Sequence, residues 1–239
     1  MPEANHTNDV RRAPLHDVVG VIAAFWVFAT LGYYYLLPAL GYSIDYNTGP
    51  VPIAIYYLIW SLASLGYFWK LFSDWLVVDS HIWRYMGTSL FIAILMAFGV
   101  HVLSFFPALH GPVVAPYTDL LFITPWYFLP KAFEVMLQQI LITTLILAFY
   151  YRYNSFKAML IAYGLLFVGS HIALFALTGA PEDHAAWITG WAACSTLVFP
   201  YLILKIRGGF VYAYAIHLSS YIVLSMILHT WPPIGYVGV

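Results

Sequence analysis

One apolar stretch, PWYFLPKAFEVMLQQILITTLILAFY, covers residues 125–150 and decides the fold. A helix that crosses the hydrocarbon core of a bilayer, about 30 Å thick, needs about 20 mainly apolar residues. This stretch meets that length. It therefore predicts a membrane-spanning helix that begins near Pro125 or Pro130 and ends near Tyr150.

The composition of the whole chain also indicates an integral membrane protein. The 239 residues are 63% hydrophobic and 8% charged, whereas a soluble domain is about 45–50% apolar and about 25% charged. Nine Lys and Arg with ten Asp and Glu are too few to cover a soluble core. The net charge of −1 provides no basic surface for a nucleic acid. The single cysteine, Cys194, excludes an intramolecular disulfide.

Further stretches bring the expected number of spanning helices to about seven, and they cover residues 18–40, 51–69, 86–106, 158–178, 186–204 and 210–230. Residues 71–82 are too short to span, so we expect an interfacial helix or a loop there. Residues 117–129 predict a re-entrant segment or a partial eighth helix. The expected fold is all-α: a polar tail over residues 1–16 and one transmembrane bundle over residues 17–239.

The distribution of cations predicts an orientation. With the N-terminus in the cytoplasm, every lysine and arginine except Lys131 falls on the cytoplasmic side, as the positive-inside rule requires. We expect an integral protein of the plasma membrane. No cleavable signal peptide is expected, because the first apolar stretch is too long. Aromatic clusters at residues 33–35, 126–128 and 150–151 predict an interfacial aromatic belt.

Ionisable residues inside spanning helices are costly, so each is a candidate functional residue. We expect Lys131 to extend its ammonium to the headgroups, His229 to be interfacial, and His101 to be a hydrogen-bonded packing residue. The remaining candidates are Glu134 and His171, together with His217, each on a different predicted helix.

Polar residues form a stripe around Glu134. The spacing of Lys131, Glu134 and Gln138 places them on one helical face, and Gln139 widens that face because it is rotated by about 100°. A purely structural role for Glu134 would be an ion pair with Lys131. The corresponding role for the histidines would be interhelical hydrogen bonding that holds the bundle together.

Three short motifs occur in order along the second half of the chain: EVMLQQ at residues 134–139, FVGSH at 167–171 and HLSSY at 217–221, the last preceded by Arg207-Gly208-Gly209. This series resembles the EExxxR, FxxxH and HxxxN motifs of the CAAX protease and bacteriocin-processing family of intramembrane proteases. The resemblance covers about Pro130 to Leu228. It implies a protease-like core over about residues 125–230.

The resemblance implies a role for each matching residue. Glu134 and His171 would activate a water molecule, and His217 would stabilise the oxyanion. The residues that would support them are Gln138, Gln139, Phe167 and Tyr221. Val135, Gln139 and Tyr221 stand where the family has glutamate, arginine and asparagine, so whether the chain is an enzyme stays open at this point.

The function that the resemblance implies is a glutamate-type endopeptidase. Its substrate would be a small peptide or protein in or attached to the membrane, with membrane lipid around it and no nucleic acid or cofactor. A zinc site of Glu134, His171 and His217 is a minor alternative. Two further hypotheses are an inactive family member that acts as a membrane binding or immunity-type partner, and an unrelated small-molecule transporter. An inverted repeat, which many transporters have, is not evident in the sequence.

Overall fold

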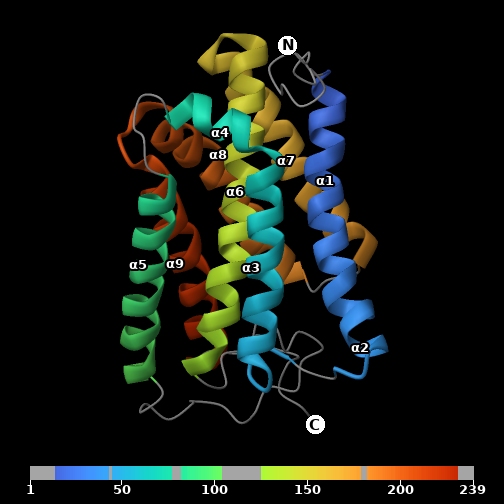
Figure 1. The fold of residues 1–239 in the computed structure, drawn as a ribbon, viewed down its shortest axis with the longest axis vertical. Helices are drawn as coiled ribbons and strands as arrows, with labels where there is room; N and C mark the ends of the chain where they lie inside the picture. The colour runs from blue at the N-terminus through green and yellow to red at the C-terminus, as the bar shows by residue number, and fades with distance from the viewer. Residues whose placement is uncertain (1–13, 43–44, 77–81, 104–124, 179–181, 231–239) are drawn as a thin grey trace, which may run out of the picture.

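The computed structural model describes residues 14–42, 45–76, 82–103, 125–178 and 182–230. All regular structure in these ranges is helical, and the helices pack side by side as a bundle (Figure 1). The all-α bundle predicted from the sequence is confirmed. The elements in chain order are α1 (Leu15–Leu31), η2 (Gly32–Leu36), α2 (Leu37–Ala39), α3 (Pro50–Tyr67), α4 (Trp69–Leu76), α5 (Ile82–Leu103), η3 (Pro125–Tyr127), α6 (Phe128–Tyr153), α7 (Phe156–Thr178), α8 (Glu182–Lys205) and α9 (Gly209–Thr230).

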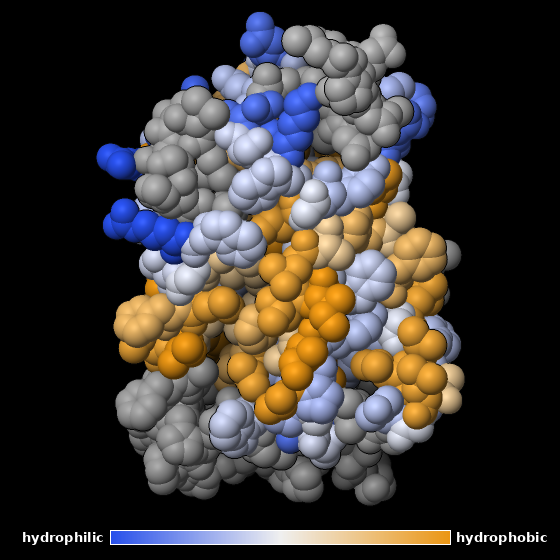
Figure 2. Space-filling view, viewed as in Figure 1, coloured by the Kyte–Doolittle hydropathy of each residue, from blue (hydrophilic) through white to orange (hydrophobic). Residues whose placement is uncertain are grey.

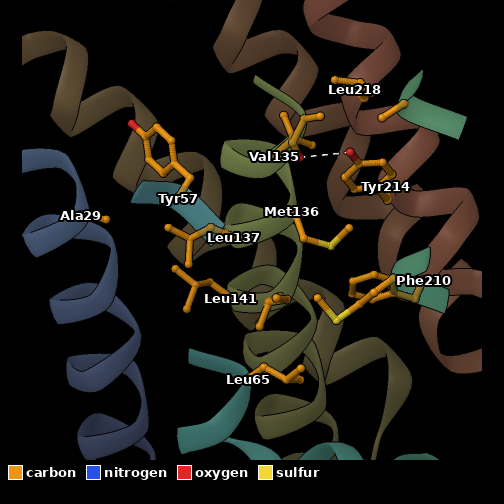
Figure 3. Close-up of a cluster of buried hydrophobic side chains, with 14 of the residues drawn as sticks. Ala29, Tyr57, Leu65, Val135, Met136, Leu137, Leu141, Phe210, Tyr214 and Leu218 are labelled. Carbon is orange, nitrogen blue, oxygen red and sulfur yellow. Dashed lines mark hydrogen bonds between the residues drawn. The ribbon is translucent and has the colours of Figure 1, made fainter. Parts of the chain in front are cut away.

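The central element is α6, the helix that the stretch at residues 125–150 predicted. Of its most apolar 18-residue window, 83% is buried inside the protein. It packs against α1, α3, α5, α7 and α9, and Figure 3 shows its side chains between α1 and α9. The α-helix begins at Phe128, between the two predicted starting points, and a short 3-10 turn at Pro125–Tyr127 precedes it. Asn154 ends α6 in the left-handed conformation, with φ of 46°.

Helices long and apolar enough to cross a membrane are found at five places within the described residues: Leu15–Ala39, Pro50–Tyr67, Phe128–Tyr153, Phe156–Ala173 and Ala185–Lys205. They match five of the predicted spans. The predicted spans at 86–106 and 210–230 are helical as α5 and α9, but they are not among these five. The bundle is that of an integral membrane protein, and the larger number of spans stays a prediction.

Two short predicted segments have different outcomes. Residues 69–76 form the short helix α4, in the region where we expected an interfacial helix or a loop. The predicted re-entrant segment at 117–129 lies mostly outside the described residues, and its last part contains η3 and the start of α6.

Apolar side chains form a band across the middle of the molecule, and hydrophilic residues gather at one end (Figure 2). Helix α1 begins at that same end, and the turn from α6 to α7 also lies there (Figure 1). Arg152, near the end of α6, and Lys157, near the start of α7, flank this turn; the cation pattern assigned both to one side. The end of α6 that begins at Phe128 lies at the opposite end of the bundle.

Two glycines permit close approaches of backbone and side chain. At Gly32, in the π-helical segment η2, an added Cβ would overlap the Tyr56 hydroxyl, which donates to the Ala29 carbonyl at 2.6 Å. At Gly209, an added Cβ would overlap the Leu202 carbonyl oxygen. Gly209, the first residue of α9, is therefore required for the tight packing of α8 on the start of α9.

Candidate functional site

A buried ion pair on the first turns of α6 forms the centre of the candidate site. The Lys131 ammonium lies 2.6 Å from Glu134 Oε2, three residues further along the helix. Lys131 is only 1% exposed, so our expectation that it extends to the headgroups was wrong. The reason is a tertiary contact: the ammonium is held by the carboxylate and by aromatic rings, which compensate for its removal from water.

Three tyrosine rings surround the Lys131 ammonium. The ring centres of Tyr46, Tyr221 and Tyr127 lie 4.6, 4.7 and 5.7 Å from Nζ, which is the range of cation–π interactions. The rings come from the loop before α3, from α9 and from η3. We call Lys131 and these three tyrosines the tyrosine cage. It joins two distant parts of the chain, the loop before α3 and α9, to α6 and the adjacent η3.

The Glu134 carboxylate accepts hydrogen bonds at both oxygens. Oε2 accepts from Lys131 Nζ at 2.6 Å and from the Tyr46 hydroxyl at 2.8 Å, and Oε1 accepts from Gln138 Nε2 at 2.9 Å. An ionised carboxylate offers about four acceptor positions. The described contacts thus occupy three of them and leave one direction on Oε1 for a water molecule.

A chain of side-chain contacts leads from Glu134 to α9. Gln138 donates to Glu134 and accepts from the Tyr221 hydroxyl at 3.4 Å. The Tyr221 ring in turn stacks on the buried His217 ring, with centroids 5.7 Å apart. The motif residues Glu134 and His217, 83 positions apart in the chain, therefore border one buried polar region.

His171 is held by its own helix. Its Nδ1 lies 2.7 Å from the Phe167 carbonyl oxygen, and its ring contacts the Phe167 ring at 4.7 Å. A carbonyl can only accept, so Nδ1 donates this bond, and in the neutral ring Nε2 then carries the lone pair. The described contacts of His171 do not include Glu134.

Two departures from the family motifs are accommodated by packing. Val135 is fully buried and lies beside Tyr214 and Leu218 of α9 (Figure 3). Gln139 is also fully buried, and its Nε2 donates to Thr143 Oγ1 at 3.4 Å. Buried, uncharged side chains thus occupy the positions where the resembled family has a second glutamate and an arginine.

The zinc alternative gains no support from the geometry. Within the part of the chain that the structure describes, no group of three His, Cys, Asp or Glu residues is arranged to hold a metal ion. Glu134, His171 and His217 thus do not form a three-ligand set in this arrangement. Their helices provide imidazole nitrogens and one ion-paired carboxylate, which suits hydrogen bonding and proton transfer.

Sequence reasoning named Tyr221 as a supporting residue but missed Tyr46 and Tyr127. We expected Tyr127 to belong to an interfacial aromatic belt, but it is fully buried, whereas the adjacent Trp126 is 63% exposed. Tyr46 could not be identified because its position in a loop carries no helical pattern. The only available signal was the paired charge of Lys131 and Glu134, which needs partners inside an apolar bundle. The side chains of His101 and His229 lie outside the described residues.

Comparisons of the chain with known protein families, with curated proteins and with solved structures find no match.

Proposed function

We propose that this chain is an integral membrane protein that hydrolyses a peptide bond in a small membrane-associated peptide or protein. The observation that supports this most is the buried polar region shared by Glu134 of α6 and His217 of α9. Gln138 and Tyr221 link these two motif residues, whose helices are distant in sequence. The inward-facing polar residues of a membrane bundle are its usual functional residues.

The proposed chemistry assigns each group a role that its contacts allow. The oxygen of a water molecule attacks the substrate carbonyl carbon, and its proton passes to the open position on Glu134 Oε1 or to Nε2 of His171. An N–H of His217 donates to the oxyanion that develops. The proton then passes to the leaving amine as the C–N bond breaks. Lys131 and Tyr46 hold the carboxylate in place during these steps.

An experiment on native membrane peptides tests this proposal. Cells that express the wild-type chain and cells that express Glu134→Gln are compared by mass spectrometry of new peptide termini in the membrane fraction. We expect termini that depend on the wild-type chain and disappear in Glu134→Gln and in His171→Ala. The control is Ser170→Ala, since the exposed Ser170 bonds the Phe167 carbonyl of its own helix. Identical termini in all samples would contradict the proposal.

A second candidate is a catalytically silent binding partner in the membrane. The observation that favours this second candidate is that three acceptor positions of the Glu134 carboxylate are already occupied. Photo-crosslinking in the same cells separates the two candidates. A silent partner would capture the same proteins with the wild-type chain and with Glu134→Gln, and neither chain would produce new termini.

The topology is proposed together with the function. We propose an N-terminus in the cytoplasm of a plasma-membrane protein, with about seven spans. The test uses single cysteines in a Cys194→Ser background, because Cys194 is exposed. A cysteine at Ser155, in the exposed turn after α6, should react only from the cytoplasm. One at the exposed Tyr42 should react only from outside. The reverse labelling would refute the orientation.

A further inference from the structure

Tyr46 is a loop residue whose side chain is almost completely buried. It lies in the turn before α3 and is only 1% exposed. The next two residues of the turn are partly buried Asn47 and exposed Thr48. Loops normally run over the surface of a protein. The turn therefore lies at the surface and inserts the Tyr46 side chain into the bundle.

Hydrogen bonds within the turn hold Tyr46 in this direction. Asp45 Oδ1 accepts from the backbone N–H groups of Asn47 and Thr48, both at 2.8 Å. The Gly49 N–H donates to the Asp45 carbonyl, also at 2.8 Å. An Asp that bonds the backbone two residues further on is a typical turn-forming residue. The backbone on both sides of Tyr46 is thus fixed, so little conformational freedom is lost when its ring enters the bundle.

The Tyr46 ring packs against tyrosines of three other segments. Its ring centre lies 5.5 Å from that of Tyr33 in η2, 6.3 Å from that of Tyr57 in α3 and 5.7 Å from that of Tyr127 in η3. Aromatic pairs at about 4.5–7 Å add to the stability that their burial provides. Helices α3 and α6 both begin at this end of the bundle (Figure 1). Tyr46 therefore joins these segments at the end of the bundle where the tyrosine cage lies.

Tyr46 contacts both charges of the buried ion pair. Its hydroxyl donates to Glu134 Oε2 at 2.8 Å, and its ring centre lies 4.6 Å from Lys131 Nζ. Two charges attract each other far more strongly in a low-dielectric interior than in water, so the strength of the pair depends on the exclusion of water. We propose that Tyr46 is a plug that closes the tyrosine cage against water on the side of the loop before α3.

The plug goes beyond the proposed hydrolysis and does not depend on it. A silent binding protein would need the same closure, because it holds the same buried pair. In a hydrolase, the plug would leave the open position on Glu134 Oε1, beside Gln138, as the place where a substrate approaches. Failure of the plug would contradict neither candidate function. The test therefore measures the access of water to the cage, and not peptide cleavage.

Hydroxyl-radical labelling of the protein in lipid nanodiscs tests the plug, because it oxidises side chains that water reaches. The probe is Tyr127, which is fully buried and contacts both Tyr46 and Lys131. We expect background oxidation of Tyr127 in the wild type. Oxidation should rise several-fold in Tyr46→Ala, which removes the plug, and should stay at background in Tyr46→Phe, which keeps the ring.

The matched control is Tyr214→Ala, because it also deletes a buried tyrosine that bonds the start of α6, at the Ala132 carbonyl. Tyr127 should stay protected in this variant. Equal oxidation of Tyr127 in Tyr214→Ala and in Tyr46→Ala would mean that a general loosening of the bundle admits water, which would overturn the proposal. Oxidation of Tyr127 in Tyr46→Ala at the wild-type level would overturn it as well.

The folding of each variant is followed in the same experiment. Tyr163 is fully buried in α7, so its oxidation rises only when the bundle unfolds. If Tyr163 is oxidised in Tyr46→Ala, the smaller deletion Tyr46→Leu takes the place of that variant, and the same two outcomes for Tyr127 decide the proposal.

Discussion

Helices α6 and α7 are consecutive and similarly apolar, with mean hydropathy of 1.8 and 1.5 over their best windows, yet their environments are opposite. In α6, 83% of that window is buried inside the protein, and in α7 only 11% is buried. Helix α6 therefore forms the protein core, and α7 lies at its periphery. Hydropathy identifies a spanning helix but does not distinguish a central helix from a peripheral one.

The polar side chains of the two helices show what distinguishes them. In α6, Glu134 and Gln138 bond to Tyr46 and Tyr221 of other segments. In α7, Ser170 and His171 bond the Phe167 carbonyl of their own helix. Lipid tails are as apolar as leucine, so polar contacts and close packing specify which helix lies at the centre of a membrane bundle.

The largest expected difference between the two helices comes from replacing one lysine in each. Lys131→Met in α6 leaves the Glu134 carboxylate without its cation, and we expect a loss of about 3 kcal/mol in the free energy of unfolding, as for other broken buried pairs. Lys157→Met in α7 removes an exposed charge and should change that free energy by less than about 0.5 kcal/mol. Denaturant titration in bicelles measures both. Equal effects would mean that the Lys131–Glu134 pair does not stabilise α6 in the core.

An intermediate effect is expected from apolar truncation. Ile140 of α6 is 0% exposed and Leu165 of α7 is 73% exposed. Lipid replaces the lost contacts of Leu165, whereas Ile140→Ala leaves a cavity inside the protein. We expect about 2 kcal/mol of destabilisation for Ile140→Ala and less than about 0.5 kcal/mol for Leu165→Ala, measured by the same titration. A comparable loss for Leu165→Ala would show that α7 is covered by a protein partner.

The smallest effect concerns single hydroxyl groups. The Tyr214 hydroxyl of α9 donates to the Ala132 carbonyl of α6 at 3.0 Å and is buried, so Tyr214→Phe should cost about 1 kcal/mol of unfolding free energy. Ser170→Ala in α7 removes a bond within one helix and should cost less than about 0.5 kcal/mol. Thermal unfolding in nanodiscs measures which of the two substitutions destabilises the protein more. A reversed order would contradict the view that contacts between helices, and not within them, hold α6 in place.

The candidate site was predictable to the extent that it follows from helical spacing. The polar stripe of Lys131, Glu134 and Gln138 is present as expected, and so is the ion pair that a purely structural role for Glu134 predicts. The path of the Lys131 side chain was not predictable, since the spacing is equally compatible with an ammonium at the headgroups. Tyr46 and Tyr221, which hold it inside, are 85 and 90 residues away in the chain.

The sequence by itself determined the class of protein and the helical segments, because hydropathy and segment length are local properties that the bilayer imposes on each span. It also determined which polar residues share one face of α6, because that face follows from 3.6 residues per turn. Only the tertiary structure decided that α6 is central, that Lys131 is enclosed by tyrosines, and that Tyr221 lies between His217 and Gln138. These outcomes depend on contacts between segments far apart in the chain, which no local periodicity encodes.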